Sequence, residues 1–186
     1  MKTIKIKDLM VPLEEYATVS VEATLFDAVI ALEEAQEELD RSRYHYLHRA
    51  VLVYDEQDNV VGKVSQLCVL QALEPRYKEM GEPSSLSKAG FSNGFLRDML
   101  RQYSLWDKPL ADICRKGAHI KVKDFMHRPS EGEFVDEEST LEEAIHLLVM
   151  GRHNSLLVTR SGNILGILRQ TDVFHEVFQR MKTCNL

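Results

Sequence analysis

The sequence lacks any long apolar run, and this absence limits where the protein can work. No stretch approaches the about eighteen consecutive apolar residues that a membrane-spanning helix needs. The N-terminal segment MKTIKIKDLM carries charges and has no apolar core of the kind found in secretory signal peptides. We therefore expect a soluble protein that works in the cytoplasm without contact with a membrane.

Cysteines are few, and basic residues are outnumbered by acidic ones. The three cysteines are an odd number without Cys-x-x-Cys spacing (Cys68, Cys114 and Cys184), which suits a reducing compartment better than a disulfide framework. The 29 acidic residues outnumber the 23 basic ones and give a net charge of −6. Because nucleic-acid-binding domains normally present a basic face, we expect no nucleic-acid partner.

The short motifs that carry common catalytic chemistry are also missing. The sequence has no GxxxxGK phosphate loop, no GxGxxG, no GxSxG elbow and no HExxH. His45 and His48 have a spacing that could bind a metal on a helix, but no third ligand candidate lies nearby. We therefore predict no catalytic residues, no metal site and no enzymatic activity.

What the sequence does contain is an internal repeat. The segment IKIKDLMVP from Ile4 matches IKVKDFMHRP from Ile120 at an offset of 116 residues. Further along, VVGKVSQLCVL from Val60 matches ILGILRQTDVF from Ile164 at an offset of 104. The difference between the offsets means that the first copy carries twelve extra residues in its middle.

Each copy has the same coarse pattern of a short strand, a helix, a strand, a hairpin turn, a strand and a second helix. Thr24-x-x-Asp27 and Thr140-x-x-Glu143 resemble capping boxes that open the first helix of each copy. The second apolar strand of each copy leads directly into the second helix. We expect the twelve extra residues to lengthen the helix of the first copy through residues 33–48, EEAQEELDRSRYHYLH.

The stretch between the copies, residues 75–118, belongs to neither. It begins with a Pro-, Gly- and Ser-rich loop and continues with an amphipathic helix. The apolar residues of that helix are Phe95, Leu96, Met99, Leu100 and Tyr103. This face could pack on its own chain or meet a partner, and packing on its own chain is the expectation.

The paired KDLM and KDFM starts and the strand-to-helix junctions resemble the CBS family, whose members occur as tandem pairs. The segment GILRQTD, Gly166 to Asp172, is similar to the family signature G-h-h-[ST]-x-x-D. The first copy, GKVSQLC, keeps Gly62 but has Cys68 in place of the aspartate. The resemblance covers residues 4–74 and 119–182.

This resemblance implies an α/β (α+β) fold made of two β-α-β-β-α repeats related by a pseudo-two-fold axis. We divide the chain into a first repeat at 1–74, a helical insert at 75–118 and a second repeat at 119–186. The resemblance is to stand-alone pairs of the bacterial type, which regulate a separate protein and commonly form homodimers. Their clefts hold adenine nucleotides such as AMP, ADP or ATP, and S-adenosylmethionine is the less expected ligand here.

The second copy carries the better candidate site. By the family pattern, Asp172 accepts hydrogen bonds from the ribose hydroxyls, and its simpler role is a favourable acid in the first helical turn. Thr171 and Gln170 add polar donors beside a helix N-terminus that suits a phosphate. Arg169 stands where the family has a hydroxyl residue, and its guanidinium could pair with a phosphate or fill the cleft.

The first copy carries a weaker site. Ser65 could donate to a phosphate, although a helix cap is its simpler role. Cys68 cannot hold a ribose, so we expect one competent site at most. The backbone around Val135 and Leu157 would supply adenine contacts by analogy with the family.

Two basic pairs, His48-Arg49 and Arg152-His153, precede the equivalent strands of the two copies. In some family members basic residues at this place reach the phosphates of the ligand. A solvated helix end is the other explanation for them, and it is slightly favoured.

Three regulatory functions stay open at this point. The first is an adenine-nucleotide sensor, which the intact Asp172 favours. The second is a ligand-independent interaction or oligomerisation module with degenerate sites, which Cys68 and Arg169 favour. The third is a redox-responsive regulator that would use Cys68 as an exposed thiol of low pKa.

Overall fold

The structure is a computed structural model that describes residues 4–80, 91–107 and 112–183. Both copies follow the predicted order of strand, helix, strand, strand and helix, so the expected α/β fold of two tandem repeats is confirmed. The first repeat contains β2 (Thr18–Ser20), α1 (Leu25–Glu37), β3 (Ala50–Tyr54), β4 (Val60–Ser65) and α2 (Gln66–Ala72). The second repeat contains β5 (Phe134–Asp136), α7 (Leu141–Gly151), β6 (Ser155–Arg160), β7 (Asn163–Arg169) and α8 (Gln170–Thr183).

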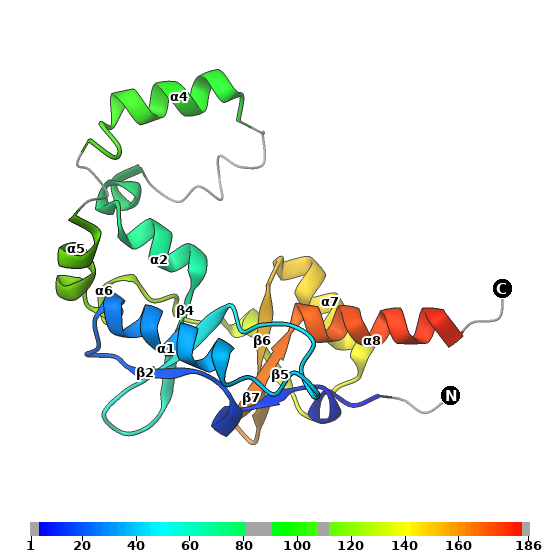
Figure 1. Ribbon diagram of the computed structural model, residues 1–186. Coiled ribbons are helices and arrows are strands. Elements are labelled where there is room, and N and C mark those ends of the chain that lie inside the picture. Colours follow the sequence, from blue (N-terminus) through cyan, green and yellow to red (C-terminus); the bar gives the residue numbers. More distant parts are fainter. Residues whose placement is uncertain (1–3, 81–90, 108–111, 184–186) are drawn as a thin grey trace.

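Each repeat builds its own small sheet, and the two sheets have the same topology (Figure 1). In both, the outer strand pairs parallel to the middle strand, which pairs antiparallel to the next: β2 with β3 and β4, and β5 with β6 and β7. A short strand near the N-terminus, β1 (Val11–Pro12), adds antiparallel to β7. At the equivalent place of the first sheet, Lys63 and His127 form a single antiparallel bridge.

The two capping boxes predicted from the sequence are present. The Thr24 side chain accepts from the backbone N–H of Asp27, whose carboxylate accepts from the Thr24 N–H in return. Thr140 and Glu143 make the same reciprocal bonds at the start of α7. Each box satisfies two backbone groups that a helix N-terminus otherwise leaves without an intrahelical partner, so it fixes where the helix begins.

The two repeats exchange their leading segments. Residues before β2 include a 3-10 turn, η1 (Ile6–Asp8), and residues before β5 include the short helix α6 (Val122–Phe125). The Ile6 N–H donates to the Ser139 carbonyl of the second repeat at 3.1 Å, and the Val122 N–H donates to the Ala23 carbonyl of the first at 2.9 Å. The same offset of 116 relates both partners, as a pseudo-two-fold axis requires.

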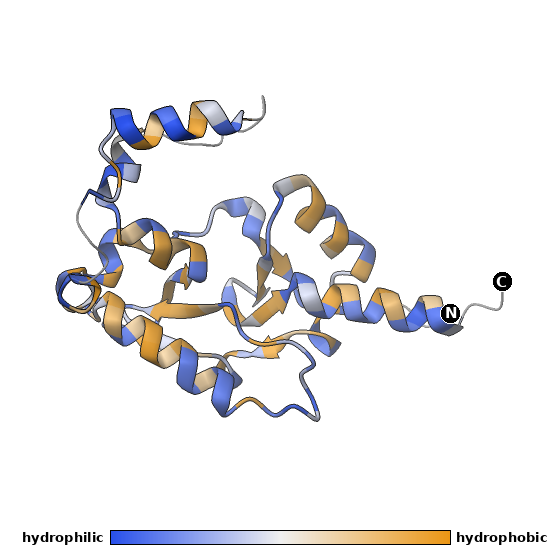
Figure 2. Cartoon of the chain, turned by 45° about the horizontal axis from the view of Figure 1, so that its top comes forward, coloured by the Kyte–Doolittle hydropathy of each residue, from blue (hydrophilic) through white to orange (hydrophobic). Residues whose placement is uncertain are grey.

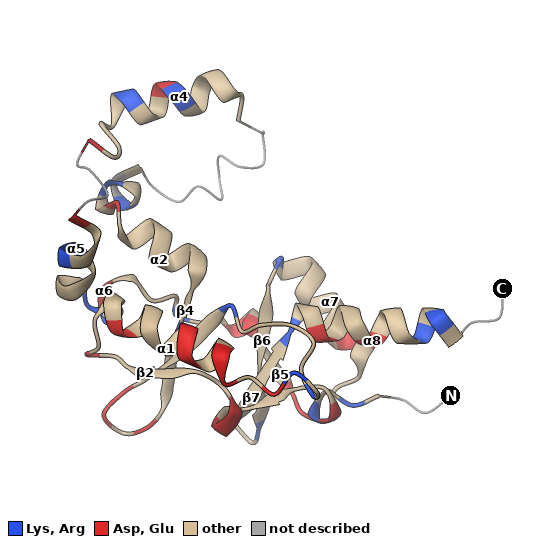
Figure 3. Cartoon of the chain, in the orientation of Figure 1, with Lys and Arg blue, Asp and Glu red and all other residues tan. Residues whose placement is uncertain are grey.

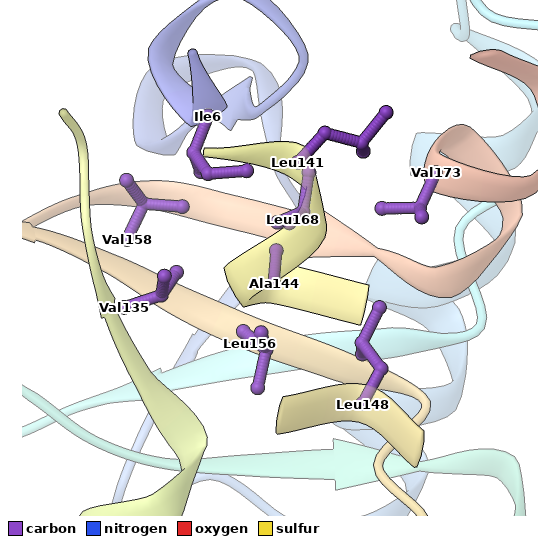
Figure 4. Packing of buried hydrophobic residues seen from close by; sticks show 9 residues of the cluster. All are labelled: Ile6, Val135, Leu141, Ala144, Leu148, Leu156, Val158, Leu168 and Val173. Carbon is purple, nitrogen blue, oxygen red and sulfur yellow. The ribbon is translucent and has the colours of Figure 1, made fainter. Parts of the chain in front are cut away.

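The hydrophobic cores reflect this exchange. Ile6 is fully buried in the core of the second repeat, although it belongs to the first copy in sequence (Figure 4). Val122 is fully buried among residues of the first repeat, including Val51, Val53 and Val64. Each core is therefore completed by a segment that the sequence attaches to the other copy, which ties the two repeats into one unit.

The two signature glycines are required by a close backbone approach. A Cβ atom at Gly166 would lie 2.4 Å from the Val11 carbonyl oxygen, where β1 pairs with β7. A Cβ atom at Gly62 would lie 3.0 Å from the His127 carbonyl oxygen and 2.7 Å from the Met126 sulfur. Only a residue without a side chain allows the leading segment of one repeat to lie this close to the strand of the other.

The prediction that the twelve extra residues lengthen the first helix is wrong. α1 ends at Glu37 and has 13 residues, against 11 in α7. Residues 38–49 instead form an irregular segment that leads to β3. Its start is fixed by Asp40, whose carboxylate accepts from the Ser42 N–H at 2.9 Å and from its hydroxyl at 2.6 Å. A local turn of this kind competes with the helical hydrogen bonds and ends the helix.

The insert between the repeats projects as an arm in its middle, while its last helix packs on α1, where Gly117 is buried beside Leu25. Its described elements are η3 (Pro75–Met80), α4 (Asn93–Gln102) and α5 (Ile113–His119). None of the residues of α4 is buried, so the expectation that its apolar face packs on its own chain is wrong. Figure 2 shows this helix apart from the body, with hydrophobic and hydrophilic residues alternating along it. The arm is anchored at its base, where the Glu74 carboxylate accepts from the Trp106 N–H at 2.8 Å.

The helices can also be compared with the length and apolar composition that a membrane span requires. Among the residues that the structure describes, no helix combines the required length with a sufficiently apolar composition.

Candidate functional site

The candidate site of the second repeat is built around an ion pair between Arg169 and Asp172. Arg169 ends β7 and Asp172 lies in the first turn of α8, so the strand-to-helix junction brings both side chains to one place. The guanidinium donates to both carboxylate oxygens, from Nε to Oδ2 at 2.6 Å and from Nη2 to Oδ1 at 2.7 Å. The side chains are only 6% and 17% exposed, so the pair is largely shielded from water.

Residues 38–49 of the first repeat, which we call the cleft segment, close over this ion pair. Arg169 Nη1 donates to the Tyr46 carbonyl oxygen at 3.0 Å and lies 3.2 Å from His48 Nδ1. The guanidinium also lies over the Tyr44 ring, 5.3 Å from its centre. A cation on an aromatic face in a poorly solvated place is held by the ring quadrupole as well as by its hydrogen bonds. The guanidinium is therefore held between the Asp172 carboxylate and the cleft segment.

Glu15, in the 3-10 turn η2 (Leu13–Glu15), holds the cleft segment from the other side. Its carboxylate accepts from the Tyr44 hydroxyl at 2.5 Å and from Arg43 Nη1 at 2.5 Å. The bond from Tyr44, together with that from Arg43, lowers the pKa of Glu15. Burial, followed by the bond to Glu15, raises the pKa of Tyr44 to about 12. The Tyr44 hydroxyl therefore stays protonated at neutral pH and remains a donor.

His48 is buried behind the ion pair. Its ring packs against the Tyr16 ring with the centres 4.4 Å apart, and only 1% of the residue is exposed. Burial and the charge of Arg169 lower the pKa of His48 to about 4. The neutral ring can accept a hydrogen bond from Arg169 through Nδ1, which a protonated ring could not do.

Two cavities open beside this cluster, and Tyr44 lines both. The larger one measures about 420 Å³ and lies between the segment before β2, the end of α1 and the cleft segment. The smaller one measures about 180 Å³ and is lined by Asp172, His175 and Glu176 of α8 and by residues of the cleft segment. Tyr44 is therefore part of the wall of both cavities, of which the smaller lies between the two repeats and the larger is lined by the first repeat alone.

The larger cavity is acidic. Five of its lining residues are carboxylates: Glu14, Glu15, Glu34, Glu38 and Asp40. Its lining contains no Lys or Arg, and Figure 3 shows the acidic residues gathered at the C-terminal end of α1. A negatively charged group entering this cavity would be repelled, whereas a neutral or cationic one would not.

The equivalent junction of the first repeat has no ion pair. Ser65 caps α2 by accepting from the Cys68 N–H at 3.2 Å, and its hydroxyl lies 3.1 Å from the Cys68 sulfur. Cys68 is a free, partly buried thiol. Neither residue offers a carboxylate, so this junction lacks the group that would hold a ribose.

The remaining predicted residues line neither cavity, but Leu157 packs in the cluster that also holds Tyr16 and Tyr44. Gln170 is exposed and its N–H donates to the Asn154 carbonyl, and Thr171 is partly buried beside it. Val135 and Leu157 are buried, but they pack in different clusters on the sheet of the second repeat. Arg49 and Arg152 are exposed, and Arg152 ends α7 in the left-handed conformation, followed by the partly buried His153.

A second buried ionic cluster was not predicted from the sequence. Glu133 accepts from Lys63 Nζ at 2.6 Å and from His127 Nε2 at 2.6 Å, and its side chain is 3% exposed. Burial opposes its ionisation, yet the bonds from Lys63 and His127 lower the pKa of Glu133 to about 2. The cluster joins the first sheet to the segment before β5. Lys63 and Glu133 lie 70 positions apart in sequence, so no local pattern indicates their pairing.

The histidines do not form a metal site. His45 packs against His175 with the ring centres 4.3 Å apart, while His48 faces Arg169. Within the described ranges, no group of three His, Cys, Asp or Glu side chains is placed to hold a metal ion.

The fold and this junction define a pair of CBS repeats. The family model described as CBS domain matches residues 6–75 and 122–179, which together make up more than half of the chain. The chain therefore belongs to the CBS domain family, as the paired motifs indicated.

Solved structures agree with this assignment. A structure of the CBS-pair protein CBSX2 from Arabidopsis thaliana is 18% identical, with a TM-score of 0.59, over 98% of this chain and 100% of that chain. A structure of CBSX2 in complex with AMP is 20% identical, with a TM-score of 0.57, over 95% and 98%. A CBS domain-containing protein from Bacillus anthracis is 15% identical, with a TM-score of 0.62, over 95% and 94%. At these identities the likeness shows the fold. A search of curated proteins gives no match.

Proposed function

We propose that this chain is a non-catalytic regulatory protein that binds an adenine nucleotide beside Asp172 and thereby controls a separate protein. The observation that carries the proposal is the position of Asp172, in the first turn of α8 and on the wall of a cleft between the two repeats. The related fold of CBSX2, which has been crystallised with AMP, supports this choice of ligand.

The chemistry of the junction suits a nucleoside monophosphate. Once Arg169 moves aside, the Asp172 carboxylate can accept hydrogen bonds from both ribose hydroxyls. The first turn of α8 offers backbone N–H groups and the positive end of the helix dipole to a phosphate. Thr171 and Gln170 add polar side chains at the same turn.

Among the candidate nucleotides we favour AMP over ADP and ATP. The carboxylates that line the larger cavity repel each added phosphate: Glu15 is paired with Arg43, but no Lys or Arg lines that cavity to balance the other four. S-adenosylmethionine, which carries a cationic sulfonium, is the next ligand to test for the same reason. We propose one site per chain, because the first junction has Cys68 where the ribose would need a carboxylate.

A second candidate function is a ligand-independent interaction module. The specific observation in its favour is the ion pair itself, because the carboxylate that would hold a ribose is already bound by Arg169 through two hydrogen bonds. Under this alternative the filled cleft is a permanent structural contact, and adding nucleotides changes nothing.

We also propose that the protein acts as a homodimer in the cytoplasm. Large apolar side chains are exposed on the two outer helices of the second repeat, α7 and α8: Val149, Met150, Phe174, Phe178 and Met181. An apolar surface of this extent usually meets a partner, and a second copy is the partner we propose. Light scattering on a size-exclusion column tests this: a mass near twice 21.4 kDa supports it, and a mass near 21.4 kDa contradicts it.

The test of the nucleotide proposal is isothermal titration calorimetry with AMP, ADP, ATP and S-adenosylmethionine, each with and without Mg²⁺. We expect AMP to bind the wild-type protein, and Asp172→Asn to weaken its affinity at least about tenfold, because an amide accepts ribose hydroxyls less well than a carboxylate does. Asp124→Asn is the matched control, since Asp124 is an exposed acid in the first turn of α6, away from the cleft.

Either outcome is informative. Selective binding of one adenine ligand that is lost in Asp172→Asn and kept in Asp124→Asn supports the sensor. If no ligand binds at millimolar concentration, the nucleotide proposal fails and the interaction module takes its place. If a ligand binds but both variants behave alike, the proposed site beside Asp172 is wrong.

A further inference from the structure

The cleft segment, residues 38–49, contains most of the extra length of the first repeat, because it has twelve residues where the second repeat has three. In the second repeat, α7 leads to β6 through residues 152–154 alone. The extra chain length of the first repeat is placed where it reaches the second repeat's junction, and its contacts there are made mainly by Tyr44, Tyr46 and His48.

These contacts occupy the groups that a nucleotide would use. The Arg169 guanidinium holds the Asp172 carboxylate, and the cleft segment holds the guanidinium through the Tyr46 carbonyl, His48 and the Tyr44 ring. Releasing Asp172 for a ribose therefore requires Arg169 to move, and Arg169 cannot move without losing its contacts to the segment.

The cavities lead to the same conclusion. Sites that enclose a small molecule usually measure roughly 300–1,000 Å³. The cavity beside Asp172 measures about 180 Å³ and is too small, while the larger one, at about 420 Å³, does not include Asp172 in its lining. Tyr44 lines both, so its ring lies where a larger space beside Asp172 would have to open.

We propose that the cleft segment is a built-in plug of the nucleotide site: Tyr44 and its neighbours close the cleft in the free protein, and a bound nucleotide displaces them. This inference rests on the function proposed above and adds its regulation. The apparent affinity for the nucleotide is the affinity of the open form multiplied by the fraction of molecules in which the plug is open. Its displacement onto the surface is then the change that a partner protein can read.

The plug is also held by hydrogen bonds on its outer side, and these can be weakened without creating a cavity. Glu15 binds both Tyr44 and Arg43 through its carboxylate, and its side chain is 34% exposed. Glu14 is its neighbour, lines the same larger cavity and carries the same charge, but none of its described contacts reaches the plug. Glu15→Gln and Glu14→Gln therefore remove the same charge from the cavity. Only Glu15→Gln also weakens the hydrogen bonds that hold Tyr44 and Arg43.

The experiment measures the dissociation constant of AMP for the wild-type protein, Tyr44→Ala, Glu15→Gln, Glu14→Gln and Leu47→Ala. We expect Tyr44→Ala to tighten AMP binding at least about tenfold, because it removes the ring that lines both cavities and raises the fraction of molecules in which the plug is open. Glu15→Gln should tighten binding about threefold more than Glu14→Gln, because it breaks the ion pair with Arg43 and makes the bond from Tyr44 a neutral one. Leu47 also lies in the plug, but it is 37% exposed and is not among the residues described above as contacting Arg169 or Glu15, so we expect Leu47→Ala to leave AMP binding unchanged.

A second readout follows the plug itself. Trypsin cleaves after Arg41 and Arg43, which both lie in the cleft segment. Ligands usually protect a protein from proteolysis, but here saturating AMP should accelerate cleavage at these two residues in the wild-type protein. Circular dichroism at the assay temperature confirms that each variant is folded. If Tyr44→Ala does not fold, the comparison of Glu15→Gln with Glu14→Gln decides.

The outcomes separate the two proposals. If AMP binds the wild-type protein and all variants alike, or slows cleavage in the segment, the plug is refuted and the nucleotide sensor stands. If AMP binds none of the proteins, Tyr44→Ala included, the sensor fails and the plug is refuted with it. Tighter binding in Tyr44→Ala and Glu15→Gln together with faster cleavage supports both.

Discussion

Removing the Asp172 carboxylate should destabilise the protein, because it leaves the Arg169 guanidinium buried without its charged partner. The Arg169 side chain is 6% exposed, and its remaining partners would be the Tyr46 carbonyl and the neutral His48 ring. Breaking one side of a buried ion pair typically costs about 3–5 kcal/mol of unfolding free energy. Asp172 is 17% exposed and borders a cavity that water can enter, so we expect the lower end of this range for Asp172→Ala, about 3 kcal/mol.

A double-mutant cycle separates the ion pair from the other effects of the substitution. Arg169→Met keeps an unbranched side chain in the cleft and removes the charge. The double variant with Asp172→Ala should lose only about 1–2 kcal/mol, because no charge is then left buried. Glu22→Ala is the control for an exposed pair: Glu22 and Lys123 are 53% and 43% exposed, and we expect a loss below about 1 kcal/mol.

The assay is urea unfolding at pH 7 followed by far-UV circular dichroism, which reports the whole fold rather than the arm that carries the single tryptophan. At this chain length, about 3 kcal/mol corresponds to a decrease in Tm of roughly 6–12 °C. The reasoning is refuted if Asp172→Ala lies within about 1 kcal/mol of the wild-type protein, or if the coupling energy of the cycle is below about 0.5 kcal/mol. Either result would mean that water or another group solvates the guanidinium.

Three further predictions concern the rest of the fold. Burial and Arg169 lower the pKa of His48 to about 4, so the His48 ring takes up its proton at a higher pH in the unfolded chain than in the folded chain. The free energy of unfolding should therefore fall by at most about 3 kcal/mol as the pH drops from 6.5 towards 4. His48→Gln should lose this pH dependence, and His146→Gln, at an exposed position, should keep it. Urea unfolding at several pH values measures both, and an equal pH dependence in the two variants would show that His48 is not its source. Ile6→Ala should cost about 3 kcal/mol, since Ile6 is fully buried in the core of the second repeat, and a loss below about 1 kcal/mol in urea would argue against the exchanged segments. Thr140→Ala removes the cap of α7 and should cost about 1 kcal/mol, with Thr140→Ser restoring most of it; a thermal melt that does not distinguish Ala from Ser would speak against the capping box.

Much of the fold could be predicted from local sequence patterns. The repeated motifs, the two capping boxes and the alternation of apolar runs with turns predict the order of elements, and the structure confirms it. These signals are local, because a capping residue acts within one helical turn and a strand pattern within a few residues. The junction that carries Arg169 and Asp172 was predicted on the same basis, as a strand that leads directly into a helix.

The contacts between the cleft segment and Arg169 could not be predicted from local patterns. The contacts of Arg169 with Tyr46 and His48 join residues more than 120 positions apart, and no periodicity indicates which loop reaches which junction. The helix predicted across the twelve extra residues failed for a related reason. Its composition suits a helix, but the Asp40 turn ends α1, and burial of Leu39 and Tyr44 between the repeats stabilises the irregular path.

The sequence by itself determined the class of this protein: two copies of one βαββα unit, their caps and turns, and a family signature with its aspartate in the second copy alone. Those features depend on backbone preferences and on apolar spacing, which act over a few residues. Only the tertiary structure decided that each repeat completes the other's core and that a segment of the first lies over the junction of the second. Both depend on side chains distant in sequence that bury apolar surface and pair charges, and such contacts exist only once the two repeats have packed together.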